Sequence, residues 1–172
     1  MNNKDTPETD VKKIALRMIP YGLYVLTARA SEEVTAATIT WVTQTAFKPT
    51  LVVAGIRADS RSHALIKQSG VFNLNVLGKG QQAIAFSFFK PSVLEDGRLS
   101  GHKFRPAANG CPILEDAPAW LECKLVNAIE GADHSVFVGE VTGAGLNASI
   151  SGRPDELTLH LRDLGEKIHY GG

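Results

Sequence analysis

Cysteine is scarce in this chain of 172 residues, and its scarcity excludes two classes of protein. Cys111 and Cys123 are its only thiols, and two cysteines build neither a Cys-rich zinc site nor a disulfide framework. A membrane-spanning helix requires an apolar run of ~18 residues, and the sequence has none. Its polar first ten residues lack the apolar core of a signal peptide. We therefore expect a cytoplasmic protein with no metal site and no membrane association.

An excess of charge of one sign is also missing, because 18 Lys and Arg residues balance 18 Asp and Glu residues. Proteins that hold nucleic acid or an anionic membrane through a broad surface carry a basic patch or stripe. No long basic run is present, so no nucleic-acid partner is expected. Any anion that the protein binds must be held by a local pocket.

What remains is the composition of a globular domain. Hydrophobic residues make up 44% and charged residues 21%, a balance that argues against disorder. The length fits one domain over residues 1–172. We expect residues 1–9 to form a tail and residues 146–172 to form a C-terminal strand and tail.

Strand patterns dominate. Segments rich in β-branched and aromatic residues, or with alternating apolar residues, are typical of strands. They cover residues 23–27, 34–42, 51–56, 71–77, 120–129, 135–142 and 157–161, and the run at 51–56 is expected to be fully buried. Short helices are predicted between Asp10 and Pro20 and over residues 60–69 and 81–88. Because helices do not alternate regularly with strands, we favour a closed or nearly closed antiparallel barrel over a parallel sheet. The long connection at 90–118 is of a length that often serves as a functional lid.

The strongest local chemistry lies at residues 57–63, Arg-Ala-Asp-Ser-Arg-Ser-His. A strand ends there and a helix begins, so first-turn N–H groups and the positive end of the helix dipole are available. Hydroxyls, guanidinium groups and an imidazole add donors suited to a phosphate. The alternative is an ordinary capped helix with solvated arginines.

A second feature is the threonine-rich segment 35–45, which also contains Trp41. One face of such a strand offers hydroxyls and backbone groups to a flat ring with polar edges. The alternative is an amphipathic strand whose threonines face water. A third feature is the turn Gly131-Ala132-Asp133-His134. Its histidine can donate a hydrogen bond, with Asp133 either orienting the ring or forming an Asx turn.

Together these segments resemble the flavin reductase-like family, the FMN-binding split barrels. The similarity lies in residues 21–27, 41–45, 47–49, 60–63, 70–77, 120–123, 133–134 and 137–141 and in the terminal Tyr170-Gly171-Gly172. The resemblance implies a mainly β fold, a six-stranded antiparallel Greek-key split barrel with a few short helices. It also implies a homodimer with FMN in a groove near the dimer interface.

The resemblance further implies which residues hold the cofactor. The residues expected to bind flavin are Thr38, Ile39, Thr40, Trp41, Val42, Gly55, Ile56, Arg57, Ser60, Arg61, Ser62, His63, Phe89 and Lys90. Phe89 and Lys90 are expected to approach from the partner subunit. His134 would position the nicotinamide, with Tyr170 as a second contact. Ala132 departs from the family's Gly-Asp-His motif.

These implications predict an NAD(P)H-dependent flavin reductase that transfers a hydride from NADH or NADPH to FMN, with FAD as the alternative flavin. A second hypothesis is an FMN-binding electron-transfer protein that passes electrons to an acceptor protein and has no NAD(P)H site. A third is a barrel that binds another small anion without redox chemistry.

Overall fold

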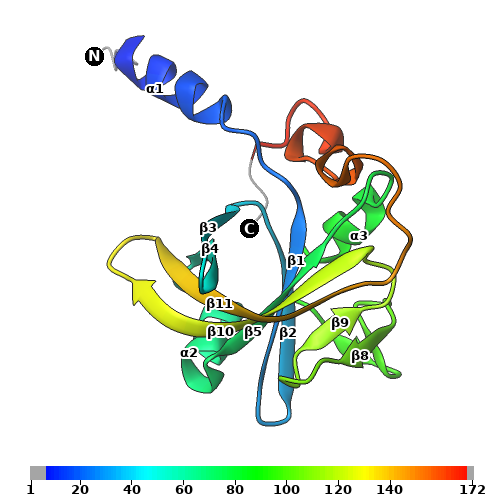
Figure 1. The fold of residues 1–172 in the computed structure, drawn as a ribbon. Helices are drawn as coiled ribbons and strands as arrows, with labels where there is room; N and C mark the ends of the chain where they lie inside the picture. The colour runs from blue at the N-terminus through cyan, green and yellow to red at the C-terminus, as the bar shows by residue number, and fades with distance from the viewer. Residues whose placement is uncertain (1–6, 170–172) are drawn as a thin grey trace.

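The structure is a computed structural model that describes residues 7–169, with side chains from residue 11 onward. Its centre is one strongly curved antiparallel sheet (Figure 1). The sheet contains β1 (Tyr24–Ala30), β2 (Glu33–Ile39), β3 (Val42–Phe47), β4 (Thr50–Arg57), β5 (Val71–Val76), β10 (Ala119–Ile129) and β11 (His134–Leu146). Their order is β2-β1-β5-β10-β11-β4-β3. The sheet thus has seven strands, and the expected number of six is wrong.

Two strand predictions needed correction. The single strand expected over residues 34–42 is interrupted at Thr40 and Trp41, because β2 and β3 lie at opposite edges of the sheet and the chain crosses between them there. The C-terminal strand expected over 157–161 is replaced by single bridges from Thr158 to Gly78 and from His160 to Gly22. They lie between two 3₁₀ helices, η1 (Pro154–Leu157) and η2 (Leu161–Leu164). This segment only crosses the ends of β1 and β5, so few of its residues find ladder partners.

The strand β4 is not fully buried as expected. Val52, Ala54 and Ile56 are buried, whereas Leu51, Val53 and Gly55 between them are partly exposed. Such alternation is typical of an antiparallel sheet that packs only one face on a core.

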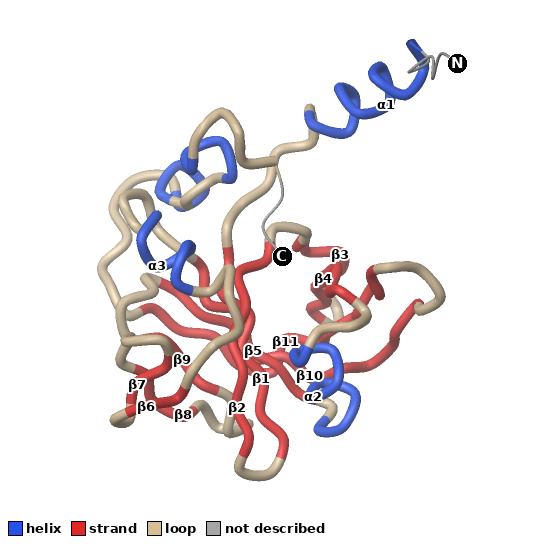
Figure 2. Tube along the Cα trace, turned by 180° about the vertical axis from the view of Figure 1, so that it is seen from behind, coloured by secondary structure: helices blue, strands red, loops and turns tan. Residues whose placement is uncertain are grey.

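Three helices accompany the sheet. The first, α1 (Pro7–Arg17), begins three residues before the expected cap at Asp10 and projects from the body of the molecule (Figures 1 and 2). The second, α2 (Arg61–Ser69), begins and ends as predicted, with Ser60 as N-cap and Gly70 in the left-handed conformation at its C-terminus. The third, α3 (Gln82–Ser87), is short. No helix within residues 7–169 is both long and apolar enough to cross a membrane.

The main core lies between the sheet and α2. Its buried members include Leu26, Leu65, Phe72 and Phe137. Gly139 is required here, because a Cβ at this position would lie 2.6 Å from the Phe72 ring. The absence of a side chain at Gly139 thus lets the Phe72 ring approach β11 closely.

The long connection at 90–118 contains two small hairpins. They are formed by β6 (Leu94–Glu95) with β7 (Arg98–Leu99) and by β8 (Phe104–Pro106) with β9 (Pro112–Leu114). Beneath them lies a second buried cluster that includes Leu77, Phe88 and Leu114. The connection is therefore a packed layer rather than an open loop.

Candidate functional site

A groove follows the free edge of β2 and ends at the first turn of α2. Its cavity volume is about 390 Å³, within the range of roughly 300–1,000 Å³ that small-molecule sites occupy. Among the residues expected to bind flavin, the groove is lined by Ile39, Gly55, Ile56, Arg57, Ser60, Arg61, Ser62, Phe89 and Lys90. The curvature of the sheet therefore brings residues from four separate segments to one surface.

The first turn of α2 supplies the groove's polar end. The Ser60 Oγ accepts a hydrogen bond from the His63 N–H at 3.2 Å, which caps the helix. The N–H groups of Arg61 and Ser62 have no partner among the described residues. Free first-turn N–H groups beside arginine side chains suit an anion.

Charged side chains surround that helix end. The Arg57 Nε donates to Asp59 Oδ1 at 2.6 Å. Arg61 donates from Nε and Nη2 to the two carboxylate oxygens of Glu33, and this contact lowers the pKa of Glu33. With Lys90, the groove holds three cations against two carboxylates. The groove thus has a local excess of positive charge on a chain that is neutral as a whole.

The segment after α3 closes the other side of the groove. The Thr38 N–H donates to the Phe88 carbonyl at 3.1 Å, and the Ala36 N–H donates to Ser92 Oγ at 2.9 Å. These bonds use the edge of β2 that does not pair with β1, and they hold Phe89 and Lys90 against that edge. Both residues therefore line the groove of their own chain, whereas the resemblance implied an approach from the partner subunit.

The threonines of this region differ from one another. Thr43 and Thr45 are exposed and face water, as the second alternative expected. Thr38 is buried, and its hydroxyl donates to the Ala85 carbonyl at 2.8 Å, which ties β2 to α3. Thr40 is also buried, and its Oγ1 has no hydrogen-bond partner among the described residues. A buried hydroxyl without a partner is costly. Thr40 is therefore the threonine of this region whose buried hydroxyl is left unsatisfied.

Trp41 and His134 meet beside the groove. A Cβ at Gly55 would lie 3.0 Å from Trp41 Cε3, so the glycine lets the indole lie on the strand. The rings of Trp41 and His134 pack edge to face with centroids 4.8 Å apart. The His134 Nδ1 lies 3.3 Å from Asp133 Oδ1. The Asp133 carboxylate thus lies where it can orient the imidazole. Neither Trp41 nor His134 lines the groove itself, and Thr38, Thr40 and Val42 do not either.

The His63 side chain faces away from the groove. Its Nε2 lies 2.9 Å from Ser135 Oγ and 3.5 Å from Glu130 Oε1, and its ring packs on Phe137. The imidazole therefore joins α2 to the start of β11. The expectation that this side chain holds an anion in the groove does not fit this geometry.

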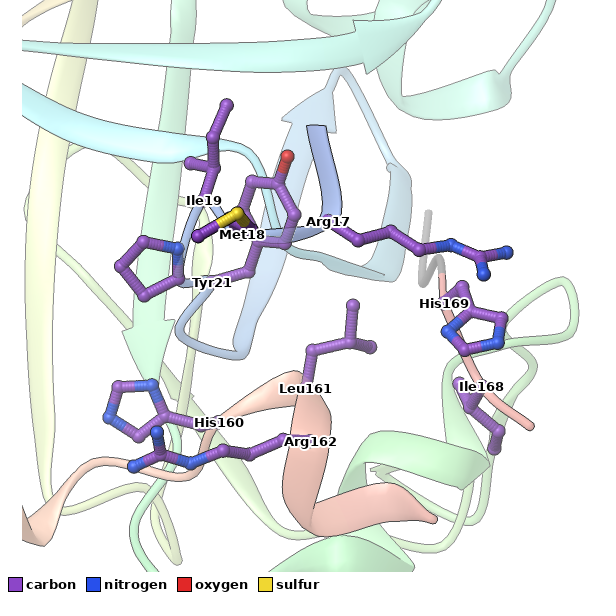
Figure 3. A pocket seen from close by; sticks show the side chains of 10 residues that line it. Arg17, Met18, Ile19, Tyr21, His160, Leu161, Arg162, Ile168 and His169 are labelled. Carbon is purple, nitrogen blue, oxygen red and sulfur yellow. The ribbon is translucent and has the colours of Figure 1, made fainter. Parts of the chain in front are cut away.

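A second, smaller pocket of about 230 Å³ lies between residues 17–21 and the C-terminal segment (Figure 3). Arg17 and His169 lie on one side of Leu161, and His160 and Arg162 lie on the other. Of the described residues expected to bind flavin or nicotinamide, none lines it. Tyr170 lies outside the described residues.

Sequence reasoning did not include half of the residues that line the groove, among them the two carboxylates of Glu33 and Asp59 and the hydroxyl of Ser92. Asp59 lies within the predicted phosphate motif at residues 57–63 but was not among the residues expected to bind flavin. Glu33 and Ser92 lie 28 and 31 residues from Arg61 along the chain. The available signal for Glu33 was an acidic residue directly before the strand expected over residues 34–42.

Comparisons with known proteins agree with this fold. The chain is 31% identical over 159 residues to a diflavin flavoprotein, A 1, of Synechocystis, covering 92% of this chain but 27% of that protein. It thus spans about a quarter of the length of the diflavin flavoproteins that it matches.

Solved structures are similar over most of the chain. An NADH:FAD oxidoreductase of Streptomyces globisporus has a TM-score of 0.69 at 26% identity, covering 85% of this chain and 82% of that one. The styrene monooxygenase flavin reductase of Pseudomonas putida has a TM-score of 0.68 at 27% identity, covering 78% and 85%. Residues 16–165 match the family model described as the flavin reductase like domain. The chain therefore belongs to the flavin reductase-like family, as the resemblance of its motifs predicted.

Proposed function

We propose that this chain is a flavin reductase that binds FMN or FAD in the β2–α2 groove and takes its electrons from NADH or NADPH. The observation that carries the proposal is the positively charged end of the groove, where two unpaired N–H groups and two arginines surround the α2 N-terminus. That arrangement fits a flavin phosphate. Relatives described as NADH:FAD oxidoreductase and probable flavin reductase support the reaction class.

The rest of the groove fits the flavin ring. Gly55 and Ile56 form one wall, and Phe89 forms part of another. Thr40 lies just after β2, and a polar ring edge that reached its buried hydroxyl would supply the partner that this hydroxyl lacks among the described residues. When bound, the flavin supplies the acceptor for a hydride. The protein's own contribution is to bind and orient the two nucleotides at reacting distance.

We further propose that His134 and Trp41 orient the nicotinamide, with Tyr170 as a second contact. The edge-to-face packing of the two rings and the nearby Asp133 carboxylate support a fixed orientation of the imidazole. A related structure of the Streptomyces globisporus enzyme is described as a complex with NAD and FAD fragments. A neighbouring nicotinamide site in this chain is consistent with that description.

The finer features of the sequence prediction are part of the same proposal. These are FMN as the preferred flavin, a single domain, a homodimer and a cytoplasmic location. The exposed apolar side chains of α1 support the homodimer, since a second copy would cover them.

The diflavin relatives favour a second candidate function. In those proteins the matching region is about a quarter of the chain, so it belongs to a larger flavoprotein. A domain of this kind would pass electrons from its flavin to a protein partner and would need no nicotinamide site of its own.

Anaerobic visible spectroscopy with added flavin separates the two functions. We expect oxidised FMN to bind and its visible bands to bleach when NADH or NADPH is added. We expect His134→Ala to slow bleaching at least tenfold while the FMN dissociation constant changes less than twofold, because the imidazole contacts the donor rather than the flavin.

The opposite result has a clear meaning. Tight FMN binding with no bleaching by either nucleotide would support the electron-transfer alternative. A protein that takes up no flavin would contradict both functions and support a barrel for another small anion.

A further inference from the structure

An ion pair closes the groove at its charged end. Glu33 is the first residue of β2, and Arg61 is the first residue of α2. Arg61 donates to both carboxylate oxygens of Glu33, although the two residues lie 28 positions apart in the sequence. Both side chains line the groove. The pair therefore connects the two walls at the place where the proposed function puts the phosphate.

Fold stability does not account for this pair. The side chains of Glu33 and Arg61 are 48% and 55% exposed, and exposed ion pairs contribute little to stability. The pair does occupy the guanidinium edge that would otherwise face an anion in the groove. Its geometry is the bidentate arrangement by which arginine also binds phosphate.

The neighbouring pair is built differently. Arg57 contacts Asp59 through Nε alone, so its two terminal nitrogens have no partner among the described residues. Arg61 gives both Nε and Nη2 to Glu33. A phosphate can thus bind Arg57 beside Asp59, but it can bind the same edge of Arg61 only by displacing Glu33.

We propose that Glu33 competes with the flavin phosphate for Arg61 and thereby keeps the flavin exchangeable, as a diffusing substrate rather than a permanently bound group. The inference rests on the proposed function. Arg61 lowers the pKa of Glu33, so the carboxylate stays ionised at neutral pH. A bound phosphomonoester carries nearly two negative charges. The phosphate must displace the Glu33 carboxylate from the Arg61 guanidinium, and the carboxylate also repels the phosphate. Both effects shorten the time for which the flavin stays bound.

The test compares flavins with and without a phosphate. Dissociation constants and off-rates of FMN and riboflavin are measured at low ionic strength, where screening is weak. For Glu33→Gln we expect FMN to bind about three to ten times more tightly and to leave correspondingly more slowly. Riboflavin affinity should change less than twofold, because it has no phosphate. In an Arg61→Gln background the same change should give a clearly smaller gain for FMN, because only the direct repulsion between the carboxylate and the phosphate is then relieved.

Glu32→Gln is the matched control. Glu32 lies next to Glu33, and its substitution removes the same charge. However, the Glu32 side chain is 98% exposed, contacts Arg29 and does not line the groove. FMN affinity should change less than twofold in this variant.

Three outcomes would overturn the inference. They are weaker or unchanged FMN binding in Glu33→Gln, equal gains for riboflavin and FMN, or an equal gain in Glu32→Gln. If these occur while the protein still binds and reduces FMN, the competition is wrong and the proposed function stands. If the unmodified protein binds neither flavin, both are wrong.

Discussion

At the residue scale, burial decides the chemistry of the two thiols. Cys111 and Cys123 are completely buried. Burial raises the pKa of Cys111 to about 11 and that of Cys123 to about 12, and the charge of Glu122 contributes in the same direction. Because the thiolate is the reactive form of cysteine, both side chains act as small apolar core residues at neutral pH.

This predicts a slow reaction of the native protein with thiol reagents. At pH 8 we expect iodoacetamide to label the folded protein at least a hundredfold more slowly than the protein unfolded in urea, because access and ionisation are both suppressed. Both pKa values are raised above the usual 9.0. The contribution of the two buried neutral thiols to the free energy of unfolding is therefore fully present below pH 9. It is lost as pH rises through about 11 and 12. Rapid labelling of the native protein would contradict the prediction.

Residue identity alone was a poor guide to where side chains point. His63 was expected in the groove, yet its ring bonds to Ser135, which lies 72 positions away. Glu33 was not expected there, yet it pairs with Arg61. Both outcomes depend on which distant strand lies next to α2, and no short sequence pattern indicates which strand that is.

At the element scale, β5 anchors the layer formed by residues 90–118. The Asn75 Nδ2 donates to the Val25 carbonyl at 3.0 Å, and its Oδ1 accepts from the Leu114 N–H at 2.8 Å. Asn73 donates to the Cys111 carbonyl at 3.2 Å. Both amides are completely buried. The polar side of this alternating strand is thus covered by the hairpin layer rather than by water.

Removal of one anchor should weaken the layer measurably. We expect Asn75→Ala to lower the free energy of unfolding by about 2–4 kcal/mol, because the buried Leu114 N–H and Val25 carbonyl each lose a partner. Urea denaturation measures the loss, and hydrogen exchange should show faster exchange at residues 112–114. Asn127→Ala is the control, because Asn127 is exposed and bonds only its neighbour's N–H. We expect it to change stability by less than about 0.5 kcal/mol. Equal losses in both variants would refute the anchoring role.

At the scale of the whole molecule, the apolar side of α1 is left uncovered. Val11 and Ile14 of α1 and Met18, directly after it, are 64%, 61% and 79% exposed, and the helix projects from the body (Figures 1 and 2). Isolated helices shorter than about 12–15 residues are only marginally stable in water. This 11-residue helix therefore gains most of its stability from a surface that covers it, and the proposed homodimer supplies one.

The homodimer is tested by light scattering after size-exclusion chromatography. We expect a dimer for the unmodified protein. We expect Ile14→Glu with Met18→Glu to weaken dimerisation by about a hundredfold or more, because buried apolar contacts are replaced by charges. Lys13→Glu changes charge on the same helix without removing an apolar side chain and should leave the dimer intact. A monomeric unmodified protein at micromolar concentration would contradict the proposal.

The sequence by itself determined what depends on a few neighbouring residues. The helix predicted over residues 60–69 forms as α2, because its caps Ser60 and Gly70 act within one helical turn. Membership of the flavin reductase-like family also followed from ordered local motifs. Tertiary structure decided the remainder. The interruption at Thr40 and Trp41, the loss of the C-terminal strand and the Glu33–Arg61 pair all depend on how far the sheet curves. That curvature determines which distant edges meet, because it arises from packing across the whole core rather than from any single segment.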